Sequence, residues 1–280
     1  MFADAVRIAT HYTRPVIISM RFHDTTLESG MAAFVVVNDD GWIVTAAHLF
    51  RAMIAFPAHQ KEIAAYEAAK TKRAKSKKKA KIPKRNPKWL TNFSYWWADD
   101  GVGVRNITAN FDLDIAVAQL DPFDPTAIGG YPTFKDPATP LRAGTSLCRL
   151  GYPFHEFKPT FKAETGFELP PGALPAPRFP LEGIFTRNVI MPVGKGGTPK
   201  FIETSSPGLR GQSGGPIFDT DGVVWGIQSR TSHLDLGFDA TTTRGKKKVV
   251  EHQFLNVGLG VHPEVINGFL TAKGIKFAKS

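Results

Sequence analysis

At residues 208–216 the chain reads Gly208-Leu209-Arg210-Gly211-Gln212-Ser213-Gly214-Gly215-Pro216, and the rest of the sequence is organised around this stretch. Glycine is used where the backbone turns tightly, takes a positive φ or approaches another group closely. A nucleophilic serine needs such a setting, because its Oγ must stand clear and nearby N–H groups must face the oxygen that becomes negative in acyl transfer. The stretch therefore predicts a nucleophile at Ser213, with a plain glycine-rich turn as the alternative.

A serine nucleophile needs a base and a group that orients the base, so the upstream sequence was searched for both. The apolar run from Gly41 leads into Thr45-Ala-Ala-His48, which places one histidine after a predicted strand. Further along, Asp114 opens a second predicted strand, Ile115–Leu120. Asp112 is predicted to be a turn residue. The sequence thus indicates His48 as the base and Asp114 as the orienting carboxylate.

The order His, Asp, Ser is that of the chymotrypsin-like peptidases and differs from the subtilisin and α/β-hydrolase orders. The segments Thr45-Ala-Ala-His48, Asp114-Ile-Ala-Val117 and Gly211-Gln-Ser213-Gly-Gly-Pro216 strongly resemble the trypsin-like serine peptidases. Within that family the chain is most similar to the disulfide-free bacterial HtrA-like branch, through residues 30–37, 150–153 and 203–213. The resemblance extends from about residue 16 to residue 270.

The resemblance implies an all-β fold of two six-stranded antiparallel β-barrels of the chymotrypsin type in one peptidase domain, residues 1–280. The first barrel is expected at about 12–125 and the second at 140–260, joined by a proline- and glycine-rich linker. A C-terminal helix is expected at 262–274, where a proline opens the helix and a glycine ends it. A helical basic insertion is expected at 57–98 within the first barrel, and no PDZ domain is expected.

The resemblance also implies roles. His48 accepts the proton of Ser213, Asp114 holds the imidazole, and the N–H groups of Gly211 and Ser213 form the oxyanion hole. No metal or other cofactor is expected, since no metal-ligand spacing or nucleotide-binding glycine motif is present.

Four further residues are implied to bind substrate. By family register, Ser229 lies near Asp114 and, with Gln228, at the base of the primary pocket. Pro207 occupies the position six before the nucleophile, where trypsins keep an aspartate, so cleavage after Lys or Arg is not implied. Arg210 is predicted either to favour an acidic substrate residue or to serve in packing or loop gating.

The net charge of +10, from 35 basic and 25 acidic residues, is concentrated in one segment. Lys70–Lys88 holds 11 basic residues and no acidic one, which leaves 24 basic against 25 acidic elsewhere. The segment is predicted to be a solvated arm or a docking arm for a polyanion or an acidic partner. The aromatic cluster that follows it is predicted to pack the insertion onto the barrel rather than to stack on bases: Trp89, Phe93, Tyr95, Trp96 and Trp97.

The single cysteine, Cys148, excludes an intramolecular disulfide and is predicted to be buried and inert. No signal peptide is expected, because charged residues interrupt the apolar stretches of the first 20 residues. No run approaches the ~20 apolar residues of a membrane span. The sequence therefore predicts a cytoplasmic, bacterial-type hydrolase.

Three functions follow from the sequence. The first is a serine endopeptidase that acts on protein or peptide substrates. The second is a protease-fold binding module whose basic arm docks nucleic acid, an anionic membrane or an acidic partner, with cleavage secondary. The third is a catalytically silent scaffold, which the complete set of His48, Asp114 and Ser213 disfavours. The oligomeric state is left open.

Overall fold

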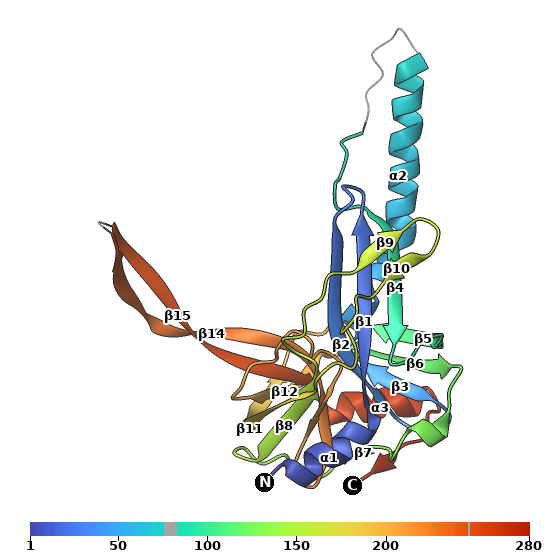
Figure 1. Cartoon of the computed structure of the whole chain (residues 1–280). Coiled ribbons are helices and arrows are strands. Elements are labelled where there is room, and N and C mark those ends of the chain that lie inside the picture. The colour runs from blue at the N-terminus through green and yellow to red at the C-terminus, as the bar shows by residue number, and fades with distance from the viewer. Residues whose placement is uncertain (76–82, 246) are drawn as a thin grey trace.

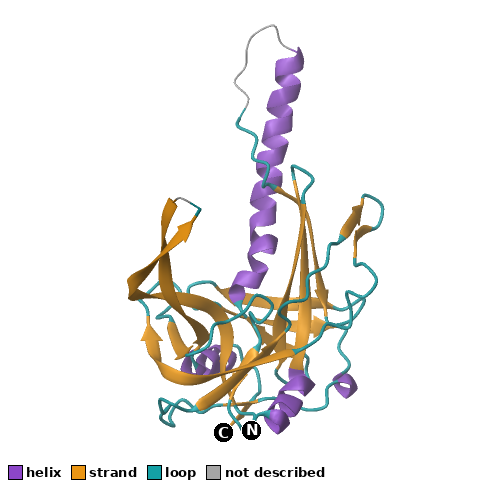
Figure 2. Ribbon diagram, turned by 60° about the vertical axis from the view of Figure 1, so that its left-hand side comes forward, coloured by secondary structure: helices purple, strands orange, loops and turns teal. Residues whose placement is uncertain are grey.

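The computed structural model describes residues 1–75, 83–245 and 247–280. Two curled antiparallel sheets form the body, and a long helix and a long hairpin project from it in different directions (Figure 1, Figure 2). The two expected barrels, the C-terminal helix and a helical insertion in the first barrel are all present. Their core is continuous, because one cluster of buried side chains draws on both sheets, including Phe34 and Ile115 from the first and Leu150 and Phe201 from the second.

The first barrel is a six-stranded sheet in the order β4-β1-β2-β3-β6-β5, with antiparallel neighbours. The strands at the two ends of this order, β4 and β5, are in contact, so the sheet curls on itself. β3 and β6 contribute almost entirely buried side chains, which fits their short apolar sequences. The strands are β1 (Thr13–Phe22), β2 (Leu27–Val36), β3 (Trp42–Thr45), β4 (Leu90–Trp97), β5 (Gly103–Asn110) and β6 (Ile115–Asp121).

The second barrel closes into a ring of six strands in the order β13-β8-β11-β12-β15-β14, because β14 also pairs with β13. Two short strands extend this sheet to eight by parallel pairing beyond β14, namely β7 (Thr133–Phe134) and β16 (Ala278–Lys279). β7 lies in the expected linker, which also holds the turn η2 (Pro125–Ala127). The ring strands are β8 (Ser146–Gly151), β11 (Phe179–Ile190), β12 (Lys200–Thr204), β13 (Pro216–Phe218), β14 (Val224–Arg244) and β15 (Lys247–Val261).

Two short helices pack on the barrels. Helix α1 (Ala3–Tyr12), which sequence analysis did not predict, buries Tyr12, whose hydroxyl donates to the Gly222 carbonyl at 3.3 Å. The predicted C-terminal helix is α3 (Pro263–Ala272), and it buries Ile266 and Leu270. Its N-terminus is capped by His262, whose Nδ1 accepts from the Glu264 backbone N–H at 3.1 Å.

Stability is expected to fall as the pH drops through the acidic range because of His262. Burial, helped by the charge of Lys200, lowers the pKa of this imidazole from 6.5 to about 4. Between these values the unfolded chain binds a proton that the folded chain does not, so acid favours unfolding. The loss due to His262 should be about 2 kcal/mol between pH 7 and pH 4.5.

Urea unfolding at both pH values measures this effect, with His262→Asn as the matched variant. Asparagine retains a capping oxygen but does not titrate, so the variant should lose about 2 kcal/mol less than the native chain over this interval. Equal losses in the two chains would show that His262 does not carry the effect.

The expected boundaries of the basic insertion, 57–98, are wrong at both ends. Helix α2 already begins at Arg51 and runs to Lys75, with Pro57 inside its first turns. At the other end, β4 belongs to the barrel, since Trp97 is paired with Val16 of β1. The sequence analysis extended the insertion to residue 98 because the aromatic residues of 89–97 directly follow the basic segment. Among the described residues, the insertion proper comprises α2 and residues 83–89, which lead into β4 (Figure 1).

The aromatic side chains of β4 pack among themselves and against the start of the insertion, as predicted. Tyr95 stacks on Trp97 with ring centroids 5.7 Å apart, and Phe50 stacks on both. Phe93 meets Phe56 of α2 edge to face at 5.0 Å. These contacts fix the base of α2 on the barrel, while its far half extends from the body (Figure 2).

Two segments are more regular than their sequences predict. The prolines and glycines of residues 161–180 predict an irregular loop, but the structure has a small hairpin of β9 (Thr160–Lys162) and β10 (Gly166–Glu168) there, held by an edge-to-face pair of Phe161 and Phe167. The apolar residues of 254–260 predict a final strand, and this stretch is the end of the longer β15, which pairs with β14 to form the projecting hairpin (Figure 1). Three consecutive lysines at 246–248 predict a solvated hairpin tip, of which Lys246 lies outside the described residues.

Candidate active site

His48 lies where the first barrel turns out of β3. The strand ends at Thr45, whose hydroxyl donates to the Ala33 carbonyl at 2.8 Å, and the chain continues into the short helix η1 (Ala47–Phe50). Ala46 and Ala47 are fully buried, so the chain passes close beneath the surface before it presents the imidazole. The small residues ahead of His48 thus allow a partly exposed ring on a closely packed support.

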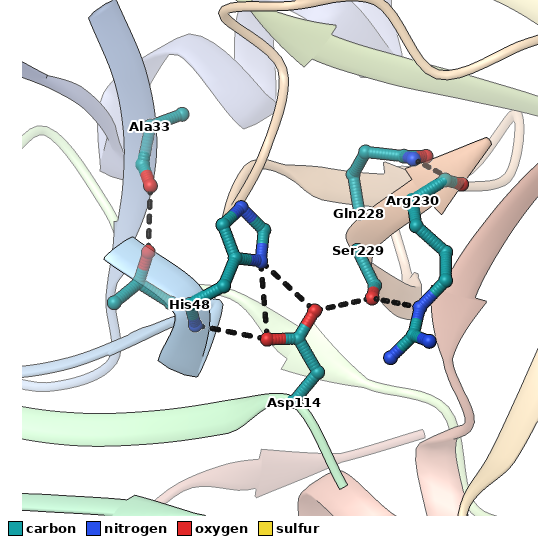
Figure 3. A network of polar contacts seen from close by, with 7 residues as sticks. Ala33, His48, Asp114, Gln228, Ser229 and Arg230 are labelled. Atoms are coloured by element: carbon teal, nitrogen blue, oxygen red, sulfur yellow. Dashed lines mark hydrogen bonds and ion pairs between the residues drawn. The ribbon is translucent and has the colours of Figure 1, made fainter. Parts of the chain in front are cut away.

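Asp114 immediately precedes β6 and faces His48 (Figure 3). Its φ is +53°, a left-handed conformation that aspartate tolerates better than most residues. The His48 Nδ1 lies 3.0 Å from Oδ2 and 3.1 Å from Oδ1, and the His48 backbone N–H donates to Oδ1 at 2.9 Å. Because a carboxylate only accepts, Nδ1 carries the proton and Nε2 keeps its lone pair. The backbone turn therefore sets both the orientation and the tautomer of the ring.

The Asp114 carboxylate is buried but well satisfied. Ser229 donates its hydroxyl to Oδ2, from the opposite side to His48 (Figure 3). Burial alone raises the pKa of Asp114, but the hydrogen bonds from His48 and Ser229 outweigh it and bring the pKa below its ordinary 3.8. Asp114 is therefore ionised at neutral pH. Asp112 lies in the preceding turn and accepts from the Gly196 N–H at 2.6 Å, away from His48.

The loop that carries Ser213 is fastened to the first barrel. The Ser213 carbonyl accepts from the Ala33 N–H at 2.8 Å. Gly214, with φ +81°, leaves no room for a side chain, since a Cβ there would lie 2.0 Å from Thr45 Oγ1 and 3.2 Å from the Ala46 nitrogen. The Ser213 loop thus packs on the segment that ends in His48, which accounts for the predicted need for glycine.

The turn before Ser213 is held by buried backbone and side-chain contacts. Gly211 has φ +97°, and a Cβ on it would lie 2.3 Å from the Tyr152 carbonyl oxygen. Its own carbonyl accepts from the Tyr152 N–H at 2.8 Å. Gln212 is fully buried and accepts from the Leu209 N–H at 3.0 Å. Within the described residues, the N–H groups of Gly211 and Ser213 donate to no protein acceptor, so both are available to a ligand.

His48 and Ser213 line one cavity of about 1010 Å³ between the barrels. Within the part of the chain that is described, the Ser213 hydroxyl has no hydrogen-bond partner, and His48 contacts Asp114 but not Ser213 by such a bond. In catalytic pairs, this hydrogen bond often forms fully only when substrate binds. Phe154 lines the cavity in a left-handed conformation (φ +60°) and is exposed. The remaining wall includes Leu49, Arg51, Tyr152, His155, Phe157, Lys158, Leu209, Arg210 and Gly211.

The four residues implied to bind substrate lie in different environments. Arg210 is exposed and lines the cavity. Ser229 and Gln228 are both buried, and neither is part of the cavity wall. Pro207 also lies outside that wall, and its carbonyl accepts from the Arg149 guanidinium at 2.7 Å.

Sequence reasoning missed two residues that shape the site. Gln212 fixes the turn of the Ser213 loop. It lies within residues 208–216, but the sequence analysis assigned it no role. Arg149 on β8 is an arginine with 2% exposure that donates to the 204–207 segment. The otherwise apolar sequence of its strand gives no sign of this role. Cys148 beside it is buried, as predicted, and burial raises its thiol pKa to about 11.

No group of three or more His, Cys, Asp or Glu side chains in the described ranges is arranged to hold a metal ion. No helix among those residues is both long enough and apolar enough to cross a membrane.

The two barrels have the architecture of the chymotrypsin-type fold. The chain belongs to the family of trypsin-like peptidase domains, whose model matches residues 32–227. A search of curated proteins returned no match.

Two examples among the solved structures with a similar fold are both proteases. One is the Rv3671c protease from M. tuberculosis in its active form, with a TM-score of 0.53, 13% identity, and coverage of 98% of this chain and 86% of that one. The other is the HtrA-type protease AlgW with a tripeptide, with a TM-score of 0.51, 14% identity, and coverage of 97% of this chain and 63% of that one. This chain thus spans less than two thirds of the length of AlgW.

Proposed function

We propose that this chain is a serine endopeptidase that hydrolyses peptide bonds in proteins through an acyl-enzyme on Ser213. The observation that carries the proposal is that His48, whose Nδ1 contacts the Asp114 carboxylate, lines the same cavity as Ser213. Membership of the trypsin-like family supports peptide hydrolysis as the reaction.

In the first half-reaction, Ser213 Oγ attacks the peptide carbonyl as His48 Nε2 takes its proton. Asp114 stabilises the imidazolium that forms and keeps Nδ1 protonated. The N–H groups of Gly211 and Ser213 stabilise the oxyanion, where one donor contributes about 2.7–4 kcal/mol. His48 then protonates the leaving amine, and in the second half-reaction it activates the water that hydrolyses the acyl-enzyme.

Digestion of a denatured proteome tests this function without knowledge of the natural substrate. New peptide termini should accumulate with the native chain and be absent with Ser213→Ala at the same concentration. The absence of new termini from the native chain, or their appearance with both proteins, would overturn the proposal.

The basic segment supports a second, additional role in docking. Lys70, Lys72, Arg73 and Lys75 are exposed on the far half of α2, which projects from the body (Figure 1). Nearer the barrel, Lys88 pairs with Glu28 at 2.8 Å. The basic residues at 77–79 and 81 lie outside the described residues. We propose that the far half of α2 binds polyanions. Separately, and from the sequence alone, we propose a cytoplasmic location.

Neutralising these four side chains, by Lys→Gln at 70, 72 and 75 and Arg→Gln at 73, is expected to weaken binding of single-stranded poly(dT). Four lost phosphate contacts should reduce the slope of log K against log salt by about 3. A control variant neutralises Lys162, Lys195, Lys248 and Lys273 and should retain the slope. Equal affinity and slope in the α2 variant and the native chain would reject the docking role.

A further inference from the structure

Arg149 is a buried arginine that lacks a carboxylate partner. With 2% exposure, it donates to the Ser206 carbonyl and hydroxyl, both at 2.8 Å, to the Pro207 carbonyl at 2.7 Å and to Thr204 Oγ1. All these acceptors are uncharged, and within the described ranges no acidic group forms an ion pair with Arg149. Burial lowers its pKa to about 10, so it still carries its charge at neutral pH. An unpaired buried charge is costly, which makes an anionic partner from outside the chain favourable.

The hydrogen-bonding capacity of Arg149 is not used up. Its Nε is one of three buried side-chain polar atoms that have no partner in the described part of the chain. Gly258 lies against the guanidinium, since a Cβ there would be 2.5 Å from Nη2. β15 thus has a glycine where any side chain would collide with the guanidinium.

The charge lies behind the segment that leads to the nucleophile. Pro207 and Gly208 are followed, after two residues, by Gly211 and Ser213. Gln228 presses on Gly208, where a Cβ would lie 2.0 Å from its Nε2, and Thr231 donates to the Gly208 carbonyl at 2.6 Å.

The segments 206–210 and 228–231 therefore lie side by side ahead of Ser213.

The cavity itself adds positive charge. Arg51, Lys158 and Arg210 line it, and Glu156 is the acidic side chain among its lining residues. A cleft whose walls carry mostly one sign of charge concentrates ligands of the other sign. The wall and the buried arginine therefore favour the same kind of substrate.

We propose that the peptidase selects an acidic side chain, glutamate or aspartate, on the acyl side of the bond it cleaves, and that Arg149 is the specificity-determining residue. This inference rests on the proposed function. Arg149 lies outside the cavity wall, behind the Ser206 and Pro207 carbonyls, and its buried charge attracts the carboxylate of the bound substrate across this segment. The basic side chains of the cavity wall attract the substrate as it approaches, and they attract acidic residues on either side of the selected one.

Matched peptides that differ only in the residue before the cleaved bond test the inference. With Glu, Asp, Gln, Leu or Lys at that position, kcat/KM for Glu or Asp should exceed that for Gln by about tenfold or more, because water screens a buried charge poorly. The preference should vanish as the pH falls below the ~4.3 pKa of the substrate glutamate. A Glu-to-Gln ratio near one at neutral pH would overturn the inference, whatever the variants do.

Variants assign the preference to a residue. Arg149→Met should bring the Glu-to-Gln ratio close to one, whereas Arg149→Lys should keep a preference for Glu, and the exposed Arg105→Met serves as control. If Arg210→Gln removes the preference and Arg149→Met retains it, the assignment to Arg149 is wrong. Should Arg149→Met fail to fold, the Arg149→Lys ratio and the wild-type pH profile decide.

A fluorophosphonate, which carries no such side chain, labels the serine independently. Normal labelling without acidic preference would refute this inference alone. Absent labelling in the native chain would refute the proposed function.

Discussion

Ser213→Ala is expected to lower kcat for peptide hydrolysis by about five to six orders of magnitude, the loss found when a triad nucleophile is removed. The reason is chemical, because the other described hydroxyl residues of the cavity wall, Ser29 and Tyr152, are hydrogen-bonded elsewhere, to Ser19 Oγ and to the Thr13 carbonyl. Steady-state hydrolysis of a fluorogenic peptide, with active-site titration of the native chain, measures the effect.

The fold should be unaffected by this change, since Ser213 contributes its backbone carbonyl to the Ala33 contact and its hydroxyl has no partner within the described chain. Urea midpoints of native and variant proteins should therefore agree. A variant that retains more than about a hundredth of the native kcat would place the nucleophile elsewhere.

Asp114→Asn is expected to lower kcat by about 10⁴-fold at neutral pH. The amide cannot stabilise the imidazolium, and its NH₂ group favours the His48 tautomer whose Nδ1 accepts rather than donates. The proton then resides on Nε2, where it blocks attack by Ser213. Peptide hydrolysis at saturating substrate measures the loss as a change in kcat.

Asp112→Asn is the matched control, because this carboxylate lies two residues away and accepts from Gly196 rather than contacting His48. It should change kcat by less than about threefold, as expected of a surface substitution outside the site. If the two aspartates were to give equal losses, the orienting role of Asp114 would be refuted.

The sequence was informative where the chemistry restricts the residue type. The glycines around Ser213 were predicted from backbone requirements, and the structure shows their causes in a positive φ and in contacts that exclude a Cβ. The choice of Asp114 over Asp112 came from its place at the start of a strand, and the structure puts Asp114 against His48. The two barrels followed from the family resemblance of these same motifs.

Features that depend on long-range packing were not predictable in this way. The sequence analysis assigned β4 to the insertion because its aromatic residues follow the basic segment closely. Only its pairing with β1 shows that it is a barrel strand. The extension of β14 and β15 into a long hairpin depends on the pairing of two polar segments, which have little apolar periodicity. Arg149 was missed because its acceptors lie 55–58 residues away in sequence.

The proposed function requires Ser213 to be a nucleophile activated by His48. Its most direct test is the intact mass of the native chain after reaction with a fluorophosphonate, followed by peptide mapping. One adduct per chain is expected, on Ser213, and it should form far more slowly in His48→Ala and Asp114→Asn. An unmodified native chain, or an adduct on a different residue, would contradict the proposed function.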